Sequence, residues 1–204
     1  MSDTIRTIEQ IESLFGAVGE ASIAKETTVL HPIYQQWIQA SPFAVLATVG
    51  PQGLDVSPRG DPAPLVRILN ETTILLPERR GNNRVDGLKN ILQDSRVALL
   101  FFIPGIKETI RVNGKASITV NQAILQSFAV DGAIPKCALE ITVESVFFQC
   151  GRAFIRSGLW DLEKHQSAQS VPSAGVILSA LTQSKIDGAA YDAELPQRQK
   201  TTLY

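Results

Sequence analysis

Residues 73–103, TILLPERRGNNRVDGLKNILQDSRVALLFFI, contain a strand, a basic turn, a helix and a second strand. Pro77 ends the first strand, because proline cannot donate a hydrogen bond to a sheet ladder. Apolar residues then recur at helical spacing from 85 to 92. Asn82 or Asn83 is the expected N-cap of this helix. The stretch therefore predicts a helix inserted between two strands, with a polar, basic corner at its start.

Strand patterns continue on both sides of this stretch. Residues 96–103 form a continuous apolar run, which is typical of a strand buried on both faces. Residues 109–120 alternate between apolar and polar side chains, as a strand with one buried face does. Upstream, Gly50-Pro51-Gln52-Gly53 has the composition and length of a hairpin turn. Residues 43–150 thus form a string of strands with short turns and two helical insertions, which favours a mainly β, α+β barrel over an α/β layer sandwich.

Three segments follow from this pattern. Residues 1–40 are predicted to be a helical segment packed on the barrel, residues 41–157 the barrel, and residues 158–204 a helix followed by a tail that drapes over its own or a partner chain. Pro32 is placed as a helix start and Asn121 as the cap of a short helix. The first segment carries an apolar helical stripe made of Ile8, Ile11, Leu14 and Phe15.

Composition narrows the function classes. The 204-residue chain has a formal net charge of −1, which gives no indication of binding to nucleic acid or to an anionic membrane. Cys137 and Cys150 lie in strand-like surroundings and are expected to be buried and inert. The two histidines are far apart in sequence, so no metal site is predicted. No signal peptide, membrane span or dinucleotide-binding glycine motif is present, and a cytoplasmic location is expected.

Polar clusters interrupt the strands at three places: residues 57–61, 80–84 and 108–114. In a barrel such strand ends lie near one another. Arginine suits planar, bidentate contact with phosphate, and the start of a helix favours an anion. Gly60 and Gly114 would allow a close approach of backbone to ligand. The clusters together fit a ligand with a phosphate at one end and a flat polar ring at the other, although RRGNNR alone equally fits a solvated basic turn.

The sequence contains no convincing catalytic group. Ser57 and Ser157 have no histidine nearby, and the clusters hold no paired carboxylates. The catalytic residues are therefore left unassigned. If a reaction occurs, a bound cofactor would supply its chemistry and the protein would hold and tune that cofactor.

Five motifs together resemble the pyridoxamine 5'-phosphate oxidase-like flavoproteins: FAVLATVGPQGLDVSPRGD, ILLPERRGNNRVDGLKNIL, ETIRVNGKA, FIRSGLWD and YDAELPQRQKTTLY. The likeness covers almost the whole chain and is nearest to a bacterial branch of that family. The resemblance implies a six-stranded antiparallel split barrel with flanking helices. It also implies a homodimer with FMN bound at the interface between subunits.

The same resemblance implies roles for individual residues. The flavin ring and ribityl chain would lie along Ser57, Pro58, Arg59 and Gly60. The FMN phosphate would be held by Arg80, Asn82, Asn83 and Arg84. Further contacts would come from Arg111 and Asn113, and from Arg156, Ser157 and Trp160 of the second subunit, although Trp160 fits a surface anchor for the tail equally well.

One departure from the family concerns the substrate. The Arg-x-His motif that the oxidases of this family share near the C-terminus does not occur here, and His165 follows Glu163-Lys164. Oxidation of a vitamin B6 phosphate is therefore not expected. The sequence predicts an FMN-dependent oxidoreductase for an unidentified small substrate. A non-catalytic flavin-binding or storage protein, and a split barrel holding deazaflavin F420 or haem, remain alternatives.

Overall fold

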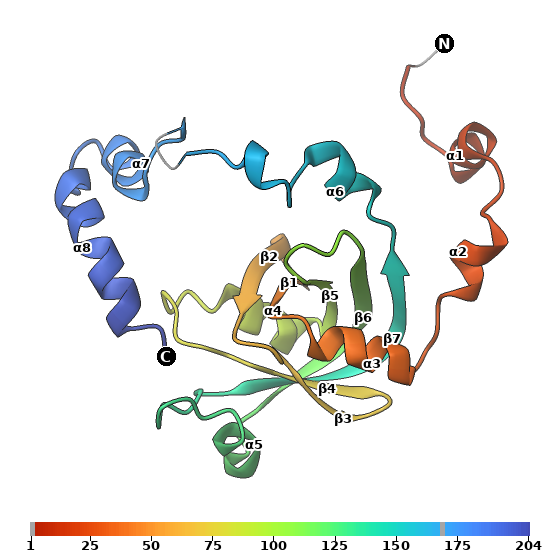
Figure 1. Cartoon of the computed structure of the whole chain (residues 1–204), viewed down its shortest axis with the longest axis horizontal. Helices are drawn as coiled ribbons and strands as arrows, with labels where there is room; N and C mark the ends of the chain where they lie inside the picture. Colours follow the sequence, from red (N-terminus) through yellow and green to blue (C-terminus); the bar gives the residue numbers. More distant parts are fainter. Residues whose placement is uncertain (1–2, 168–169) are drawn as a thin grey trace.

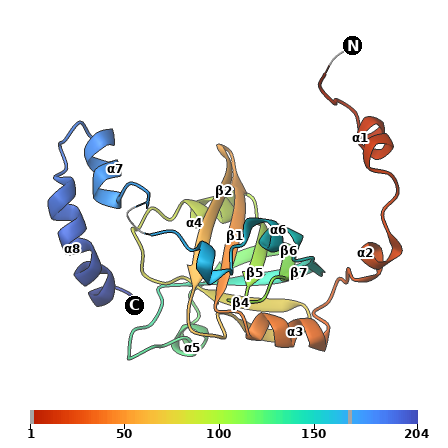
Figure 2. The ribbon, with the colours of Figure 1, turned by 45° about the horizontal axis from the view of Figure 1, so that its top comes forward.

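The computed structural model describes residues 3–167 and 170–204. Figure 1 shows a central β-sheet, a helical N-terminal arm on one side and a pair of helices at the C-terminal end on the other. In Figure 2, after a rotation of 45°, the N-terminal arm and the C-terminal pair of helices again extend from the sheet on opposite sides. Residues 1–2 and 168–169 belong to the predicted terminal segments and lie outside the described residues.

The sheet has seven strands in the described part of the chain, in the order β2-β1-β5-β6-β7-β4-β3, and each neighbouring pair is antiparallel. The resemblance had implied six strands, and the four-residue β3 brings the number to seven. The sheet is also not closed, because β2 pairs with β1 alone and β3 with β4 alone among these residues. The strands are β1 (Phe43–Gly50), β2 (Gly53–Gly60), β3 (Arg67–Asn70), β4 (Thr73–Pro77), β5 (Arg96–Phe102), β6 (Thr109–Thr119) and β7 (Ala138–Gln149).

Alternation in the sequence predicted the strand faces well in one case and less well in another. In β6, Ile110 and Val112 are buried and Arg111 is exposed, as the pattern indicated. The prediction that β5 is buried on both faces was wrong, because Leu99 is buried while Leu100 is only half-buried. A continuous apolar run does not by itself distinguish two buried faces from one buried and one partly covered face.

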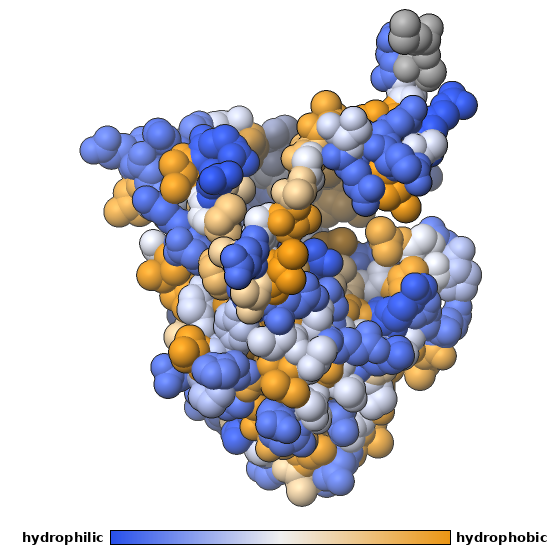
Figure 3. Space-filling view, turned by 90° about the vertical axis from the view of Figure 1, so that its right-hand side faces the viewer, coloured by the Kyte–Doolittle hydropathy of each residue, from blue (hydrophilic) through white to orange (hydrophobic). Residues whose placement is uncertain are grey.

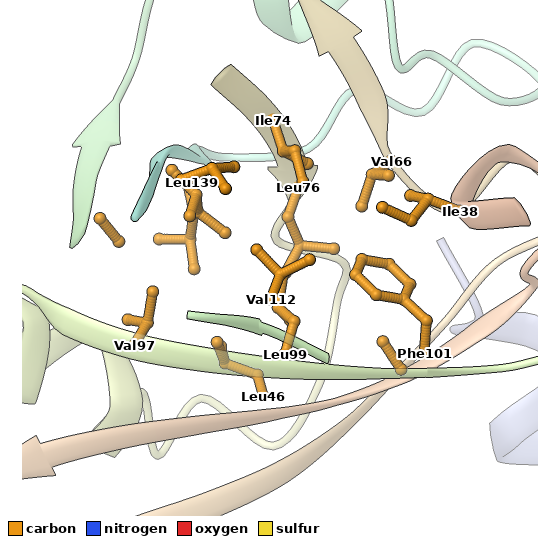
Figure 4. Close-up of a cluster of buried hydrophobic side chains, with 14 of the residues drawn as sticks. Ile38, Leu46, Val66, Ile74, Leu76, Val97, Leu99, Phe101, Val112 and Leu139 are labelled. Carbon is orange, nitrogen blue, oxygen red and sulfur yellow. The ribbon is translucent and has the colours of Figure 1, made fainter. Parts of the chain in front are cut away.

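The main core lies on the inner face of the curved sheet. Figure 4 shows Leu46, Leu76, Phe101 and Val112 from four strands meeting Ile38 of the third helix. All five side chains are almost fully buried. Removing such a side chain from water contributes about 1.5–3 kcal/mol to folding, so this cluster is the principal apolar contribution to stability. A second, smaller cluster lies under the 121–128 segment and comprises Leu75, Leu125, Phe128 and Ala138.

Helices flank the sheet and extend beyond it. None of those described is long and apolar enough to cross a membrane. Two begin as predicted: Pro32 opens its helix, and the side chain of Asn121 accepts hydrogen bonds from the first turn of the next. The described helices are α1 (Ile8–Phe15), α2 (Glu20–Ala24), α3 (Pro32–Gln39), α4 (Asp86–Gln93), α5 (Gln122–Gln126), α6 (Arg152–Ser157), a 3-10 turn (Leu162–Lys164), α7 (Ala174–Leu181) and α8 (Gly188–Thr201).

The N-terminal arm, which consists of α1 and α2, leaves its apolar side chains in solvent. No residue of either helix is buried. Ile8 and Phe15 of the predicted apolar stripe are 71% and 79% exposed. Figure 3 shows the arm standing out from the body of the molecule with hydrophobic residues on its surface. The stripe is therefore present as predicted, but it is not packed against any other part of the described chain.

The tail, which was expected to drape over a surface, instead forms α8 and pairs with α7. The two helices approach closely at two glycines: a Cβ on Gly175 would lie 2.0 Å from the carbonyl oxygen of Gly188. The carboxylate of Asp192 accepts hydrogen bonds from the hydroxyl of Ser173 and, at 2.7 Å, from the backbone N–H of Gly175. The capping of α7 by a residue of α8 makes the pair one unit.

Gly114 marks a β-bulge, where the register between β6 and β7 shifts. A Cβ at this position would lie 2.1 Å from the carbonyl oxygen of Thr142. The close approach predicted at Gly114 is therefore to the backbone of β7 rather than to a ligand. Glycine is needed here because any side chain would push the two longest strands apart.

Replacing Gly114 with alanine should lower the free energy of unfolding by about 1–3 kcal/mol, because the added methyl group overlaps the neighbouring strand. Gly81→Ala is the matched control, since a Cβ there meets nothing within 4 Å, and it should change the free energy by less than about 0.5 kcal/mol. Urea denaturation of both variants measures the difference. Equal effects of the two substitutions would contradict the proposed role of the bulge.

Candidate functional site

A cavity of about 960 Å³ lies between the end of β2 and the loop that follows β4. It brings together two of the three polar clusters that the sequence singled out. Helix α4 packs against β1 and β2 and supplies the remaining side of the cavity (Figure 2). The predicted site residues that line it are Ser57, Pro58, Arg59, Gly60, Arg80, Asn82 and Arg84.

Two ion pairs join the walls of this cavity. The guanidinium of Arg59 lies 2.6 Å from the carboxylate of Glu78, and that of Arg79 lies 2.5 Å from the carboxylate of Asp61. Arg59 lies in the edge strand β2 and Asp61 directly follows it, whereas Glu78 and Arg79 follow β4, toward the other side of the open sheet. Side-chain contacts rather than a backbone ladder therefore connect the two sides.

Arg59 is one of the residues predicted to contact a flavin ring. It does line the cavity, but its Nη1 atom is bound to Glu78. Its Nε atom is buried and has no hydrogen-bond partner among the residues that the structure describes. A buried donor without an acceptor costs free energy, so this atom is suited to a polar ligand group at the cavity wall.

Arg79 holds the loop after β4 in place. Besides its ion pair with Asp61, it donates from Nη1 to the carbonyl oxygen of Phe128 at 2.7 Å. The ring of Tyr204 lies 5.2 Å from its guanidinium carbon. The side chains of Arg79 and Asp61 are 16% and 6% exposed. This partly buried arginine thus fixes the loop and is fully engaged by the protein itself.

Arg80, the next residue, differs from Arg79 in both exposure and contacts. It is exposed, lines the cavity and has no hydrogen-bond or ion-pair partner in the described chain. Arg84 is 77% exposed and lies 2.8 Å from Asp86. That hydrogen bond lowers the pKa of the Asp86 carboxyl below its ordinary value. Arg80 is therefore free to bind an anion, and Arg84 can do so by leaving or sharing an exposed carboxylate.

The start of α4 adds to this basic corner. The expected N-cap, Asn82 or Asn83, was wrong: the helix begins after Val85, which makes no side-chain capping bond. The side chain of Asn82 instead accepts from the backbone N–H of Arg84 at 3.1 Å. Asn83 and Val85 both have positive φ, which is unfavourable for a β-branched residue. The uncapped first turn of α4 borders the cavity, where an anion would be stabilised.

The third predicted cluster lies elsewhere in this chain. Neither Arg111 nor Asn113 lines the cavity. Arg111 donates from Nε to the side-chain oxygen of Asn113 at 3.1 Å, and Asn113 donates to the hydroxyl of Ser145 at 3.1 Å. The guanidinium of Arg111 also lies over the ring of Phe147. These side chains form a polar row across β6 and β7.

Arg156, Ser157 and Trp160 also lie outside the cavity. Ser157 and Arg156 are in the last turn of α6, and the serine hydroxyl bonds back to the carbonyl oxygen of Phe154. The ring of Trp160 stacks on that of Phe154 at 5.7 Å, and its Nε1 donates to the carbonyl oxygen of Ile106 at 2.8 Å. Within one chain, Trp160 thus fastens the segment after α6 to the 103–108 loop.

A second hollow of about 460 Å³ lies on the other side of the 79–85 loop. Asn83 lines this hollow rather than the larger one, and Cys137 lies in its wall. Cys137 is buried as predicted, and burial raises the pKa of its thiol. Cys150 corrects the other half of that prediction: it follows the last residue of β7 and is exposed.

Sequence reasoning missed three residues of the site as participants. Asp61 stood inside the 57–61 cluster and Arg79 directly before the 80–84 cluster, but their pairing depends on how the strands curve. Tyr204 lines both hollows, although it lies 143 positions from its hydrogen-bond partner Asp61. The signal in the sequence that could have pointed to Tyr204 was an aromatic residue in a tail that is otherwise mostly polar.

The two neighbouring arginines should differ in their effect on stability. Arg79→Ala would leave the carboxylate of Asp61 nearly buried without its partner, and we expect a loss of about 3 kcal/mol in the free energy of unfolding. Arg80→Ala removes an exposed, unpaired side chain and should cost less than about 0.5 kcal/mol. Chemical denaturation of the two variants distinguishes them, and a reversed order would refute the assignment of Arg79 as the residue that fixes the loop.

Comparison with known proteins places the chain in a family. No curated protein matches it. Among solved structures, HupZ of Group A Streptococcus is 20% identical, with a TM-score of 0.47 over 58% of this chain and 93% of that one. A Lactobacillus delbrueckii protein described as a putative pyridoxamine 5'-phosphate oxidase is 22% identical, with a TM-score of 0.46 over 59% and 95%. An FMN-binding protein from Syntrophomonas wolfei is 10% identical, with a TM-score of 0.43 over 70% and 97%. The family model described as pyridoxamine 5'-phosphate oxidase matches residues 30–150, more than half of the sequence, and the chain belongs to that family.

Proposed function

We propose that this protein is an FMN-binding flavoprotein that acts as an oxidoreductase on a small substrate. The observation that carries the proposal is the cavity of about 960 Å³ whose basic corner holds the unpaired Arg80 and the uncapped start of α4. A nucleotide with a flat ring and a terminal phosphate fits such a cavity in charge and size. Membership of the pyridoxamine 5'-phosphate oxidase family supports a flavin as that nucleotide.

The phosphate is proposed to bind at the basic corner. Arg80 and Arg84 would supply charge-assisted hydrogen bonds, and Asn82 would supply an amide donor. Asn83 lines the smaller hollow and would reach the phosphate only if the 79–85 loop moved. Since Arg84 lies against Asp86, phosphate would compete with that exposed carboxylate. Arg79 is not included, because its guanidinium is held by Asp61 and Phe128.

The ring end of FMN is proposed to lie along the other wall, against Ser57, Pro58 and Gly60. The buried Nε of Arg59 would donate to a polar atom of the flavin. Bound FMN would supply hydride transfer at its N5 atom. The chain would bind and orient the ring, and the walls would exclude water from one face of it. The proposal assigns no acid or base to the protein.

We further propose a homodimer in which a second subunit completes the site. Exposed apolar side chains on α1 and on the α7–α8 pair support an interface, because isolated chains rarely leave such clusters in water. Val176 and Leu181, for example, are 57% and 79% exposed. In this proposal the segments 1–40 and 158–204 contact the partner, and residues 41–157, which contain the open sheet, form the FMN-binding unit. The second subunit would contribute Arg156, Ser157 and Trp160, as the resemblance implies. Because Arg111 and Asn113 do not line the cavity of their own chain, we assign them to the partner's side of the site as well.

The purified protein should be yellow, with an absorption band near 450 nm, and the released cofactor should have the mass of FMN. Absorbance spectroscopy and mass spectrometry of the released ligand measure this directly. Uptake of deazaflavin F420 or haem in preference to FMN would refute the flavin assignment. Turnover of the bound flavin with a reductant and oxygen would distinguish an oxidoreductase from a flavin carrier.

Arg80→Ala and Arg84→Ala should each weaken FMN binding by about 1.5–3 kcal/mol, the contribution of a hydrogen bond to a charged group. Arg96→Ala is the control, because Arg96 is paired with Asp94 at the start of β5 and lines neither hollow. Titration of each apoprotein with FMN, followed by flavin fluorescence, gives the affinities. If both variants keep the affinity of the unaltered protein, the phosphate does not bind at this corner.

A further inference from the structure

The segment after α8 returns to the cavity and places Tyr204 against its wall. The hydroxyl of Tyr204 donates to the carboxylate of Asp61 at 3.0 Å. Its ring lies over the guanidinium of Arg79, 5.2 Å from the guanidinium carbon. One side chain thus contacts both members of the partly buried ion pair that fixes the loop after β4.

Tyr204 lies at the basic end of the cavity. It lines both the larger and the smaller hollow, and so do Arg79, Arg80 and Asn82. The residues proposed for the flavin ring, Ser57 to Gly60, line the larger hollow. Tyr204 therefore forms part of the wall beside the 79–82 loop, where the anion is proposed to bind.

The hydroxyl of Tyr204 keeps its proton, and so its hydrogen bond to Asp61, at neutral pH. Burial raises the pKa of the Tyr204 phenol, and its hydrogen bond to Asp61 raises it further. Because an ordinary tyrosine already titrates near pH 10, this hydroxyl stays protonated and remains a donor at neutral pH. Tyr204 and Arg79 together satisfy the carboxylate of Asp61, which is 6% exposed. The charge of Arg80 is then left for an external anion.

We propose that Tyr204 is a positioning residue that closes the anion end of the cavity and holds the 79–82 loop, so that the site discriminates in favour of a phosphorylated flavin over an unphosphorylated one. The inference rests on the proposed flavin binding and goes beyond it by naming the residue that sets the preference for the phosphate. Loss of the side chain would admit water to the Asp61–Arg79 pair and loosen the loop that carries Arg80.

The experiment compares Tyr204→Ala and Tyr204→Phe with the unaltered protein. Tyr191→Ala is the matched control: this tyrosine also stacks on an arginine, with the guanidinium carbon of Arg198 at 4.4 Å, but it lines neither hollow. Affinities for FMN and for riboflavin are measured separately by flavin fluorescence. The rate of FMN release is measured by stopped-flow after trapping, and thermal unfolding without ligand is recorded for every variant.

In Tyr204→Ala we expect FMN affinity to fall about tenfold, equivalent to ~1.4 kcal/mol, with faster release and a riboflavin affinity within about twofold of the original. Tyr204→Phe keeps the ring over Arg79 but loses the bond to Asp61, so it should recover part of the FMN affinity. Tyr191→Ala should match the unaltered protein. If Tyr204→Ala does not fold, Tyr204→Phe still tests the proposal through the ratio of the two affinities.

Parallel losses of FMN and riboflavin affinity would overturn the inference, because they would indicate general damage to the structure. Unchanged FMN affinity in both Tyr204 variants would overturn it as well. Failure of the unaltered protein to bind either flavin would refute the proposed function itself, and with it the role of Tyr204. The two failures are thus distinguished by the unaltered protein alone.

Discussion

The cavity depends on two ion pairs that span the gap in an open sheet. Backbone hydrogen bonds hold each strand to its neighbours from β2 to β3, but none of the described pairings joins those two edges. Arg59–Glu78 and Asp61–Arg79 instead connect β2 and the residue after it with the loop that follows β4, the strand next to the far edge. Two backbones joined by an ion pair between side chains lie farther apart than two strands joined by a ladder hydrogen bond. Space therefore remains between the walls that these ion pairs connect. The ligand-sized cavity therefore lies where the sheet is left open.

Neighbouring residues of the same type have different tasks around this gap. Arg79 and Arg80 are adjacent, yet the first is enclosed by Asp61, Phe128 and Tyr204 while the second has no partner in the described structure. The carboxylates determine which arginine is neutralised. Each arginine that is not neutralised adds positive potential to the corner beside α4, where the first-turn N–H groups add to it. The proposed preference for an anion thus rests on which charges remain uncompensated, rather than on the number of arginines.

The fold could be predicted from the sequence to the extent that local patterns determine it. Alternation gave the faces of β6, and proline and asparagine gave the starts of α3 and α5, because these features depend on neighbours in the chain. The start of α4 could not be predicted, since it requires a left-handed valine at position 85, against its intrinsic preference. The bonding of Arg59 to Glu78 could not be predicted either, because it depends on how the open sheet curves. Three polar clusters were expected to meet, and the chain brings two of them together. The third lies on a strand face. The curvature of the sheet determines where that face lies relative to the cavity, and local sequence patterns do not encode this curvature.

The two glycines where α7 and α8 meet have a consequence for distant parts of the molecule. A side chain larger than hydrogen at Gly175 or Gly188 would force the helix axes apart, because the backbone of one helix occupies the space of the missing Cβ on the other. Helix α8 is about 20 Å long by its rise per residue. It contains Pro196 and leads from this crossing to the segment that carries Tyr204, so a shift of its first turn would be passed along the helix toward Tyr204. Variation at this crossing would therefore be mechanically coupled to the wall of the cavity, and a screen for altered ligand selectivity could find substitutions far from any ligand contact.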